Sequence, residues 1–365
     1  MTYPILDCIH QYIYEDICTL ATADLSWEKL KNKTVLITGA NGFIAYYLTT
    51  ALLIRNDLYN DNITVLALVR NQEKAEKRFG DILKRDDIKL IVQDVCEDIA
   101  TEDKADYVIH SASQASAYFF EHDPVGTIDA NLTGTYKVLE YSRKCHAVTL
   151  FVSSLKVYGD LHTGKAKISE TDIGYLDPTN YKNCYAQGKR ASETLCASFH
   201  KQYGMSIKIA RPSYIYGASS LDDDRVWAQF IANIVRNENI LLKSAGTPYR
   251  SFCYVTDTAV ALLKILLDGK DIYPYNISSE NSNVTIRNFA KTAVEAFPER
   301  NLSLSFANKE DEIEKTISIM DKTPEILDST RLNELGWTAK VSLTEGIQRA
   351  VKIVELQSGS SSTNP

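Results

Sequence analysis

A short apolar run, KTVLIT (33–38), leads directly into a turn with two glycines, and the helical stretch FIAYYLTTALLIRN follows. A strand, a glycine-rich turn and a helix in this order form the unit that seats a pyrophosphate on a helix N-terminus. Gly39 permits the tight turn, Gly42 lets the backbone approach the phosphates, and Ala45 lets helix and strand pack closely. The spacing is GxxGxxA rather than GxGxxG. A glycine turn alone can be structural, but in this context it predicts a dinucleotide site.

Apolar runs that alternate with helical stretches continue beyond this unit. They predict five more strands, at 63–69, 88–95, 106–113, 148–154 and 206–212, with long helices before the fifth and sixth strands. Strands that alternate with helices in this way imply an α/β fold with a doubly wound parallel (Rossmann) sheet. Ligands bind at the carboxyl ends of such strands, where Gly39, Ser154 and Arg211 fall.

The pattern changes after the sixth strand. Loops, helices and short strands predict a smaller α/β substrate-binding lobe over 213–357, which closes over the sheet edge and is interleaved with a dinucleotide-binding domain over 32–212. Ahead of both domains, residues 1–31 form an extension. Its apolar side chains recur at nearly a helical period and predict one amphipathic helix followed by a connector through Trp27; they are Ile5, Ile9, Ile13, Ile17 and Leu20. The tail SGSSSTNP (358–365) has the composition of a disordered segment.

A tyrosine and a lysine four residues apart, Tyr185 and Lys189 in NCYAQGKRASETL, lie on one face of the predicted helix. A lysine ammonium beside a phenol favours the phenolate and lowers the pKa of the tyrosine. The tyrosine can then take a proton from an alcohol near neutral pH. Most pairs with this spacing lie on a solvated helix face, but the glycine turn and the stretch FVSSLKVYGD (151–160) favour a chemical role here.

The charge and the cysteines restrict the class of partner and the compartment. A net charge of −7 argues against a nucleic-acid or anionic-membrane partner. The seven cysteines are scattered without a CxxC pair, which indicates a reducing cytoplasm, and the six histidines lack metal-ligand spacing. No apolar run reaches the roughly 18 residues of a membrane span, and the N-terminal residues do not resemble a signal peptide. We therefore expect a cytoplasmic protein without a metal site.

The residues after the second and third predicted strands concern the adenosine half of the cofactor. A chain that binds NAD carries an acidic residue at the end of the second strand to bond the ribose. Here Arg70 stands there, with Lys74 and Arg78 on the following helix. Arg70 would either meet a 2′-phosphate, which means NADP, or stack on the adenine; a solvated basic helix start explains it equally well. Asp94 is placed to reach the adenine edge.

Several segments together resemble the extended short-chain dehydrogenase/reductase superfamily, and within it the NAD-dependent epimerases and dehydratases of nucleotide sugars. They are TGANGFIA, SASQAS, NLTGTYKVLEYSR, SSLKVYGD, YAQGK, IARPSYIYG and RSFCYVTD, and the resemblance runs from Lys33 to about Glu355. Within this superfamily, CYAQGKRASETLC, DRVWAQFI and YRSFCYVTD are most similar to segments of the UDP-glucuronate decarboxylases.

The resemblance implies a role for each matching residue. Ser154 would bond the reacting hydroxyl, Tyr185 would act as the base, and Lys189 would hold the nicotinamide ribose and tune Tyr185. The implied NAD contacts (alternatively NADP) are Gly39, Asn41, Gly42, Phe43, Ile44, Arg70, Asp94, Val95, Ser111, Ala112, Ser113, Lys189, Arg211 and Pro212. The implied nucleotide-sugar contacts are Ser154, Lys156, Tyr214, Arg225 and Arg250. Arg250 would grip the diphosphate; its alternative is a surface ion pair with a residue such as Asp257.

The resemblance also implies a homodimer built through a four-helix bundle. Each subunit would contribute two helices, at about Val125–Cys145 and Tyr185–Tyr203. The first has a partly apolar surface, made by Leu132, Tyr136, Leu139 and Tyr141, which could also be explained by packing on the sheet.

Two departures from the family pattern bear on the reaction. Leu155 and Lys156 follow Ser154 where decarboxylases and 4,6-dehydratases carry an acidic residue, and Tyr214 stands where an asparagine often contacts the sugar. Lys156 could also be a surface lysine. We expect an enzyme that oxidises a hydroxyl of a nucleotide sugar, at C4, to a keto intermediate and then epimerises it. The alternatives are an NADPH-dependent ketoreductase, a UDP-glucuronate decarboxylase-like enzyme, or a non-catalytic dinucleotide sensor or scaffold.

Overall fold

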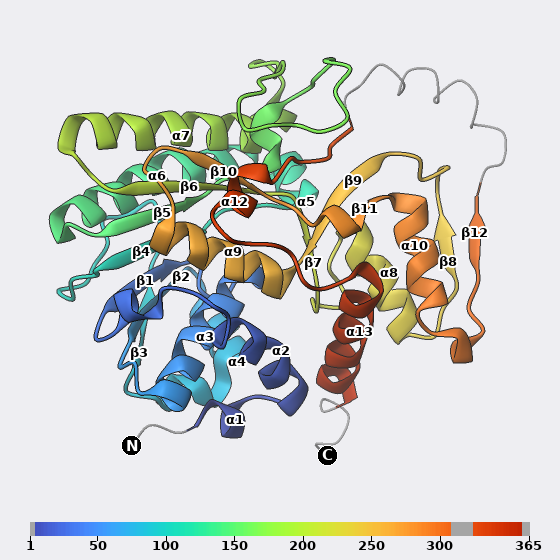
Figure 1. Ribbon diagram of the computed structural model, residues 1–365, viewed down its shortest axis with the longest axis horizontal. Coiled ribbons are helices and arrows are strands. Elements are labelled where there is room, and N and C mark those ends of the chain that lie inside the picture. Colours follow the sequence, from blue (N-terminus) through green and yellow to red (C-terminus); the bar gives the residue numbers. More distant parts are fainter. Residues whose placement is uncertain (1–3, 308–323, 360–365) are drawn as a thin grey trace.

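Seven strands form one parallel sheet in the order β10-β6-β5-β4-β1-β2-β3. The structure, a computed structural model, describes residues 4–307 and 324–359 (Figure 1). The strands are β1 (Thr34–Thr38), β2 (Thr64–Val69), β3 (Ile88–Val92), β4 (Tyr107–His110), β5 (Val148–Val152), β6 (Ile207–Pro212) and β10 (Pro274–Ile277). The chain runs from β1 toward one edge and from β4 toward the other, so the strand order reverses between β1 and β4. A reversal of this kind opens a crevice at the carboxyl ends of the two strands.

The α/β fold class with a doubly wound parallel sheet is confirmed, with differences at the strand ends. β3 ends at Val92 and β4 at His110, so each strand stops before the end that its apolar run predicts. The seventh strand, β10, was not predicted. It has only four residues and begins with a proline, so it carries no usable periodicity.

Helices cover both faces of this sheet (Figure 1). α3 (Phe43–Tyr59), α4 (Gln72–Phe79) and α9 (Val255–Asp268) lie on one face, and α6 (Pro124–Cys145) and α7 (Cys184–Tyr203) lie on the other. Successive residues of a strand point to opposite faces. In β1, Val35 and Ile37 pack into the large core on the α3 side, whereas Leu36 packs into the smaller core beneath α6.

A second group of elements lies beside the sheet (Figure 1). β7 (Tyr214–Tyr216), β9 (Tyr249–Tyr254) and β11 (Asn283–Thr285) form a three-stranded sheet in the order β11-β9-β7, and β8 (Ile240–Leu242) pairs with β12 (Leu304–Phe306). The helices there are α8 (Val226–Val235), α10 (Ile286–Glu295) and α13 (Leu343–Gly359). Between β9 and β11 the chain returns to the main sheet through α9 and β10. A short helix, α12 (Thr330–Glu334), lies near β10.

The extension before β1 forms two helices, α1 (Ile5–Cys8) and α2 (Gln11–Ala21), and not the single helix that was predicted. Ile9 has an extended backbone between them, and the imidazole Nδ1 of His10 accepts a hydrogen bond from the Tyr12 N–H and caps α2. A capping side chain satisfies a free N–H group and so marks a new helix start. The predicted apolar face is nevertheless buried, at Ile13 and Ile17, against α3 and α9.

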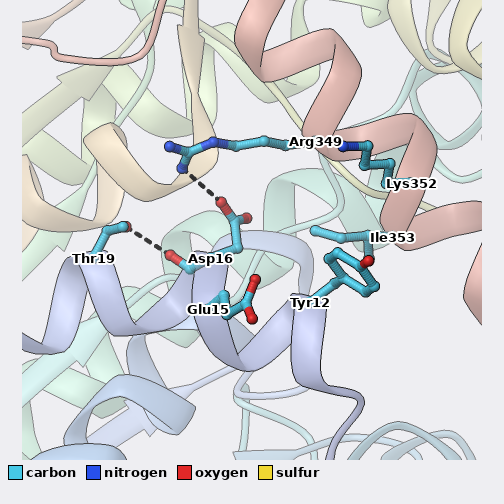
Figure 2. A pocket seen from close by; sticks show the side chains of 7 residues that line it. All are labelled: Tyr12, Glu15, Asp16, Thr19, Arg349, Lys352 and Ile353. Atoms are coloured by element: carbon cyan, nitrogen blue, oxygen red, sulfur yellow. Dashed lines mark hydrogen bonds and ion pairs between the residues drawn. The ribbon is translucent and has the colours of Figure 1, made fainter.

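One buried carboxylate ties the extension to the rest of the molecule (Figure 2). Asp16 on α2 accepts hydrogen bonds from the hydroxyl groups of Tyr47 (3.2 Å) and Tyr254 (2.9 Å) and from Arg349 Nη1 (3.1 Å). These donors come from α3, β9 and α13. Burial raises the pKa of Asp16, and the three donors offset part of that effect. We call these four residues the Asp16 junction.

The structure also shows the state of the cysteines and bears on membrane spans and metal sites. All seven cysteines have free thiols. Within residues 4–307 and 324–359, no helix combines the length and apolar character of a membrane span, and no group of three His, Cys, Asp or Glu side chains is arranged to hold a metal ion.

The Asp16 junction predicts a large stability loss on Asp16→Ala. The change leaves two buried hydroxyl groups without their acceptor and removes one of the two carboxylates that pair with the Arg349 guanidinium, the other being Glu345, so we expect the free energy of unfolding to fall by about 2–3 kcal/mol. The matched control is Glu15→Ala, because Glu15 is exposed on the same turn of α2. Urea denaturation of both variants measures the difference, and equal midpoints would show that the junction contributes nothing.

Candidate active site

A cavity of about 300 Å³ lies at the carboxyl ends of β1, β4, β5 and β6, where the smaller sheet meets the larger one. The glycine turn after β1, the end of β5, the start of α7 and the elements β7 and α8 all contribute to its wall. Its lining includes most of the residues that the sequence singled out. These are Gly39, Gly42, Phe43, Ile44, Ser111, Ser113, Ser154, Lys156, Tyr185, Lys189, Pro212, Tyr214 and Arg225.

The glycine turn is shaped for close approach. Gly39 has a φ of +67°, and a Cβ placed on it would lie 3.0 Å from the Ala112 Cα, so a side chain is excluded there. The Gly42 N–H bonds the Gly39 carbonyl (2.8 Å), and α3 begins at Phe43 with no side-chain cap on its first N–H groups. Asn41 lies within this turn. Uncapped N–H groups at the start of a long helix favour an anion.

The end of β4 is fastened to the end of β1. The Ser111 hydroxyl donates to the Thr38 carbonyl (2.6 Å), and the Ala112 N–H donates to the Thr38 hydroxyl (3.1 Å). Ser113 donates to the Asn131 side chain on α6 (3.1 Å). Ser111 to Ser113 therefore form the second wall of the crevice that the glycine turn opens.

The residues predicted to meet the adenosine lie after β2 and β3. Arg70 is exposed directly after β2, so its guanidinium is accessible. Asp94 lies in the turn after β3, not in the strand, and its carboxylate accepts from the Cys96 N–H (2.9 Å). Val95 is buried against Gly134 of α6. Their positions are compatible with the predicted adenosine contacts.

The three predicted catalytic residues meet in the cavity. Ser154 is the N-cap of a short 3₁₀ helix, η3 (Leu155–Tyr158), and Tyr185 and Lys189 lie one turn apart on α7. Tyr185 is buried and stacks on Phe120 of α5 (Ala117–His122), with ring centroids 5.0 Å apart. This combination brings a phenol, a hydroxyl and an amine to one wall beside the glycine turn.

The electrostatics of Tyr185 differ from the sequence-based expectation. Burial raises its pKa, and the hydrogen bond from Ser154 and the charge of Lys156 lower it in part. Lys189 Nζ lies 5.9 Å from the centroid of the Tyr185 ring and donates to the Val152 carbonyl (2.8 Å), and burial lowers its own pKa to about 7. Its predicted effect on the phenol stays a prediction, and Lys156 on η3 is a second cation in the same cavity wall.

Lys156 has defined partners, so it is not the free surface lysine of the alternative interpretation. Its Nζ lies 2.9 Å from the Tyr214 hydroxyl and 3.1 Å from Glu325 Oε1. Arg250 Nη1 lies 2.9 Å from Glu325 Oε2, and the Tyr214 hydroxyl donates to the same carboxylate. We call Lys156, Tyr214, Arg250 and Glu325 the Glu325 cluster.

Two arginines have partners that the sequence did not indicate. The ion-pair partner of Arg250 is Glu325 and not Asp257; the Asp257 carboxylate is buried and accepts from the backbone N–H groups of residues 340 and 341. Arg225 pairs with Asp223, and its guanidinium lies over the rings of Phe43 and Trp227, 5.0 and 4.6 Å from their centroids.

The Arg211 side chain lies outside the cavity lining. Its guanidinium forms a two-pronged ion pair with Glu193 (2.9 and 2.6 Å) and donates to the Tyr158 hydroxyl (3.0 Å), so it fastens β6 to α7 and η3. It does not line the cavity, whereas its neighbour Pro212 does. β6 therefore directs the Arg211 side chain toward α7, and its predicted cofactor contact stays a prediction.

Several residues at the two cavities were not predicted, and three of them bear on the chemistry. Phe120 and Trp227 line the cavity as aromatic walls, and Glu325 lines the adjoining cavity of about 250 Å³ that also contacts Tyr185. DRVWAQFI placed Trp227 beside a predicted site residue, so it could have been found. Phe120 and Glu325 belong to no motif, and only the fold brings them to the site.

The residues present fit a dinucleotide. Gly39 and Gly42 line the cavity without side chains, the first N–H groups of α3 are uncapped, and Lys189 and Ser154 line the same cavity. The glycine turn would hold the pyrophosphate, and Lys189 would hold the ribose next to the reacting group.

Comparison with known proteins identifies the family. Residues 35–278 match the NAD dependent epimerase/dehydratase family. UDP-glucuronic acid decarboxylase 3 of Arabidopsis thaliana is 32% identical over 319 residues, which cover 87% of each chain. UDP-glucuronic acid decarboxylase 1 of Danio rerio is 27% identical over 88% of this chain and 72% of its own length.

Solved structures share the fold at lower identity. The UDP-glucose 4-epimerase of Thermotoga maritima with UDP-glucose superposes with a TM-score of 0.72 and 22% identity, over 89% of this chain and 99% of that one. The dTDP-glucose 4,6-dehydratase of Bacillus anthracis in complex with NAD superposes with a TM-score of 0.71 and 18% identity, over 90% and 98%. The fold, the glycine turn and the match over 35–278 agree: the chain is an enzyme that belongs to the NAD dependent epimerase/dehydratase family of extended short-chain dehydrogenases/reductases.

Proposed function

We propose that this enzyme oxidises a hydroxyl of a nucleotide-linked sugar, at C4, and converts the keto sugar to its epimer. The observation that carries the proposal is the meeting of Ser154, Tyr185 and Lys189 on one wall of the cavity, next to the glycine turn. Ser154 would hold the sugar hydroxyl, and Tyr185 as phenolate would take its proton. Bound NAD supplies the acceptor for the hydride and returns it, so the cycle needs no outside reductant. Reduction of the keto sugar from its other face gives the epimer.

The cavity also offers groups for the nucleotide diphosphate. Arg225 lines it, and Arg250 lies in the Glu325 cluster at its side. The chain is net acidic, so local cations must offset the charge of a diphosphate. We propose that these two arginines bind it, with Tyr214 beside the sugar.

Decarboxylation of a nucleotide-linked uronic acid is the second candidate. The plant relatives are named for that activity, and Glu325 brings a carboxylate to Lys156, where the sequence after Ser154 supplies none. Incubation with UDP-glucose, UDP-galactose and UDP-glucuronate separates the candidates, because an epimerase interconverts the first two or changes C4 of the third without release of CO₂. A chain that binds NAD but turns over no nucleotide sugar would support the sensor or scaffold.

Tyr185→Phe tests the base. The change removes the phenol hydroxyl and keeps the ring that stacks on Phe120, so the fold should survive while turnover falls by ~10²-fold or more. Tyr203→Phe, at the exposed end of the same helix, is the control and should be unaffected. Turnover of the accepted sugar, with circular dichroism to check the fold, gives the comparison. Near-normal turnover by Tyr185→Phe would eliminate the mechanism.

Arg70→Ala tests the choice of cofactor. A redox-neutral cycle favours NAD, so we expect Arg70 to stack on the adenine and its loss to weaken NAD and NADP alike. A contact to a 2′-phosphate would instead weaken NADP alone, by about tenfold or more. Lys74→Ala, on the exposed start of α4, is the control. Calorimetric titration with each cofactor decides between these outcomes, and an NADP preference that Arg70→Ala abolishes would favour the ketoreductase.

The dimer stays a proposal, with a smaller apolar surface than predicted. Leu139 and Tyr141 are buried within the subunit, while Tyr136 on α6 is 46% exposed and Leu132 is half-buried. We expect light scattering to show a dimer at micromolar concentration and Tyr136→Glu to make it a monomer, because the change places a charge in the proposed helix bundle. Tyr249→Glu, at an equally exposed tyrosine on β9, should remain dimeric. A monomeric parent protein would refute the bundle.

A further inference from the structure

Lys156 lies where two cavities adjoin, and Tyr185 and Phe120 line both of them. The backbone N–H of Lys156 donates to the Ser154 hydroxyl (3.2 Å), so the backbone of this lysine is fixed to the residue that hydrogen-bonds the Tyr185 phenol. Its Nζ is held from the other side by Tyr214 and Glu325, at 2.9 and 3.1 Å. The backbone on one side and the Glu325 cluster on the other therefore fix the ammonium where the two cavities that Tyr185 lines adjoin.

The two lysines near Tyr185 differ in charge. Lys189 is fully buried on the Val152 carbonyl, and its pKa of about 7 leaves it only partly protonated at neutral pH. Burial would also lower the pKa of Lys156, but Tyr214 and the Glu325 carboxylate raise it above its ordinary value. Lys156 therefore carries a full positive charge at every pH at which the enzyme would work.

Other charged groups face this region from each neighbouring element, and most have partners of their own. Lys182 pairs with Glu121 of α5 (3.1 Å), Arg225 pairs with Asp223, and Glu193 pairs with Arg211. Arg190 of α7 donates to the carbonyl groups of Val157 and Gly174, and the Asp123 carboxylate caps α6. Asp160 lines the second cavity, and His122 bonds the Tyr118 carbonyl. Lys189 Nζ lies 5.9 Å from the centroid of the Tyr185 ring but is only partly charged, whereas the charge of Lys156 lowers the pKa of Tyr185.

We propose that Lys156 is a positioning residue whose ammonium stabilises the phenolate of Tyr185, and that the Glu325 carboxylate tempers this effect. The proposal rests on the proposed function, in which Tyr185 is the base. It gives Lys156 a role other than the acidic group that many relatives carry after the Ser/Thr. It also gives a role in catalysis to Glu325, which lies 171 positions after Ser154 in the sequence (325 − 154).

The two partners of this ion pair have opposite effects on Tyr185. Loss of the Lys156 charge destabilises the phenolate, so Lys156→Met should raise the pKa of Tyr185. Loss of the Glu325 charge leaves the ammonium uncompensated, so Glu325→Gln should lower it. Each shift should be on the order of one pH unit, the size expected for a charge within a few ångströms. If the ion pair were purely structural, either substitution would lower the stability of the protein, and the pKa of Tyr185 would not shift in opposite directions.

The test reads the ionisation of Tyr185 directly. The protein is labelled with carbon-13 at the tyrosine ring carbon that bears the hydroxyl, saturated with NAD, and titrated by NMR; Tyr185→Phe identifies the signal. We expect Lys156→Met to titrate at higher pH than the parent, Glu325→Gln at lower pH, and Lys156→Arg close to the parent because it keeps the charge. The measurement needs no substrate, so it stands even if no nucleotide sugar is turned over.

The matched control is the ion pair of Lys167 and Glu280 (2.7 Å), which lies on the surface and lines neither cavity. Lys167→Met and Glu280→Gln should leave the titration of Tyr185 unchanged. Thermal melting at neutral pH checks that every variant is folded. The proposal would be overturned if the titration curves of Lys156→Met, Glu325→Gln and the parent coincide, or if both variants shift in the same direction. It would also be overturned if Tyr185 shows no ionisation before the protein unfolds.

Discussion

The hydrogen bonds that join the end of β1 to the end of β4 hold the site together. The Thr38 hydroxyl accepts hydrogen bonds from the N–H groups of Ser111 and Ala112, and the Thr38 carbonyl accepts one from the Ser111 hydroxyl. His110 Nδ1 lies 2.8 Å from the Thr38 hydroxyl. These two strands pair with each other and mark the reversal of the strand order, so the bonds at their ends extend the strand pairing to the rim of the crevice. Ala112 can lie this close to the turn because Gly39 has no side chain. Ser154, which follows β5, and Tyr185 and Lys189 on α7 form the catalytic wall next to this edge.

The side chains that surround the reacting groups are held from several elements at once. Tyr185 depends on Phe120 for its packing, Ser154 on η3 for its direction, and Lys156 on Tyr214 and Glu325 for its position. η3 directly follows Ser154, whereas Phe120, Tyr214 and Glu325 are far in the sequence from the residues that they hold. The catalytic wall is therefore assembled from both groups of elements, so a change in the smaller sheet can alter the chemistry on the larger one.

The sequence predicted those features whose cause is local. The glycine turn, the six apolar strands and the spacing of Tyr185 and Lys189 follow from neighbouring residues, and the structure brings them together as expected. Features that depend on distant partners could not be predicted. Arg211 lies near the end of β6, a strand that ends at the site, yet the guanidinium pairs with Glu193 on α7, and that pairing is fixed only by the packing of two elements. Likewise, the pKa of Tyr185 depends on burial and on Lys156, and neither effect is visible in a four-residue spacing.

The Asp16 junction has a consequence for the order in which the chain acquires its structure. Asp16 precedes its distant donors along the chain, because Tyr254 follows 238 positions later and Arg349 follows 333 positions later. Because synthesis runs from the N-terminus, we expect α2 to be able to pack on α3 before two of the three donors of its carboxylate have been made. Until then Asp16 would remain solvated. We therefore expect the full burial of Asp16 to wait for the smaller sheet and α13.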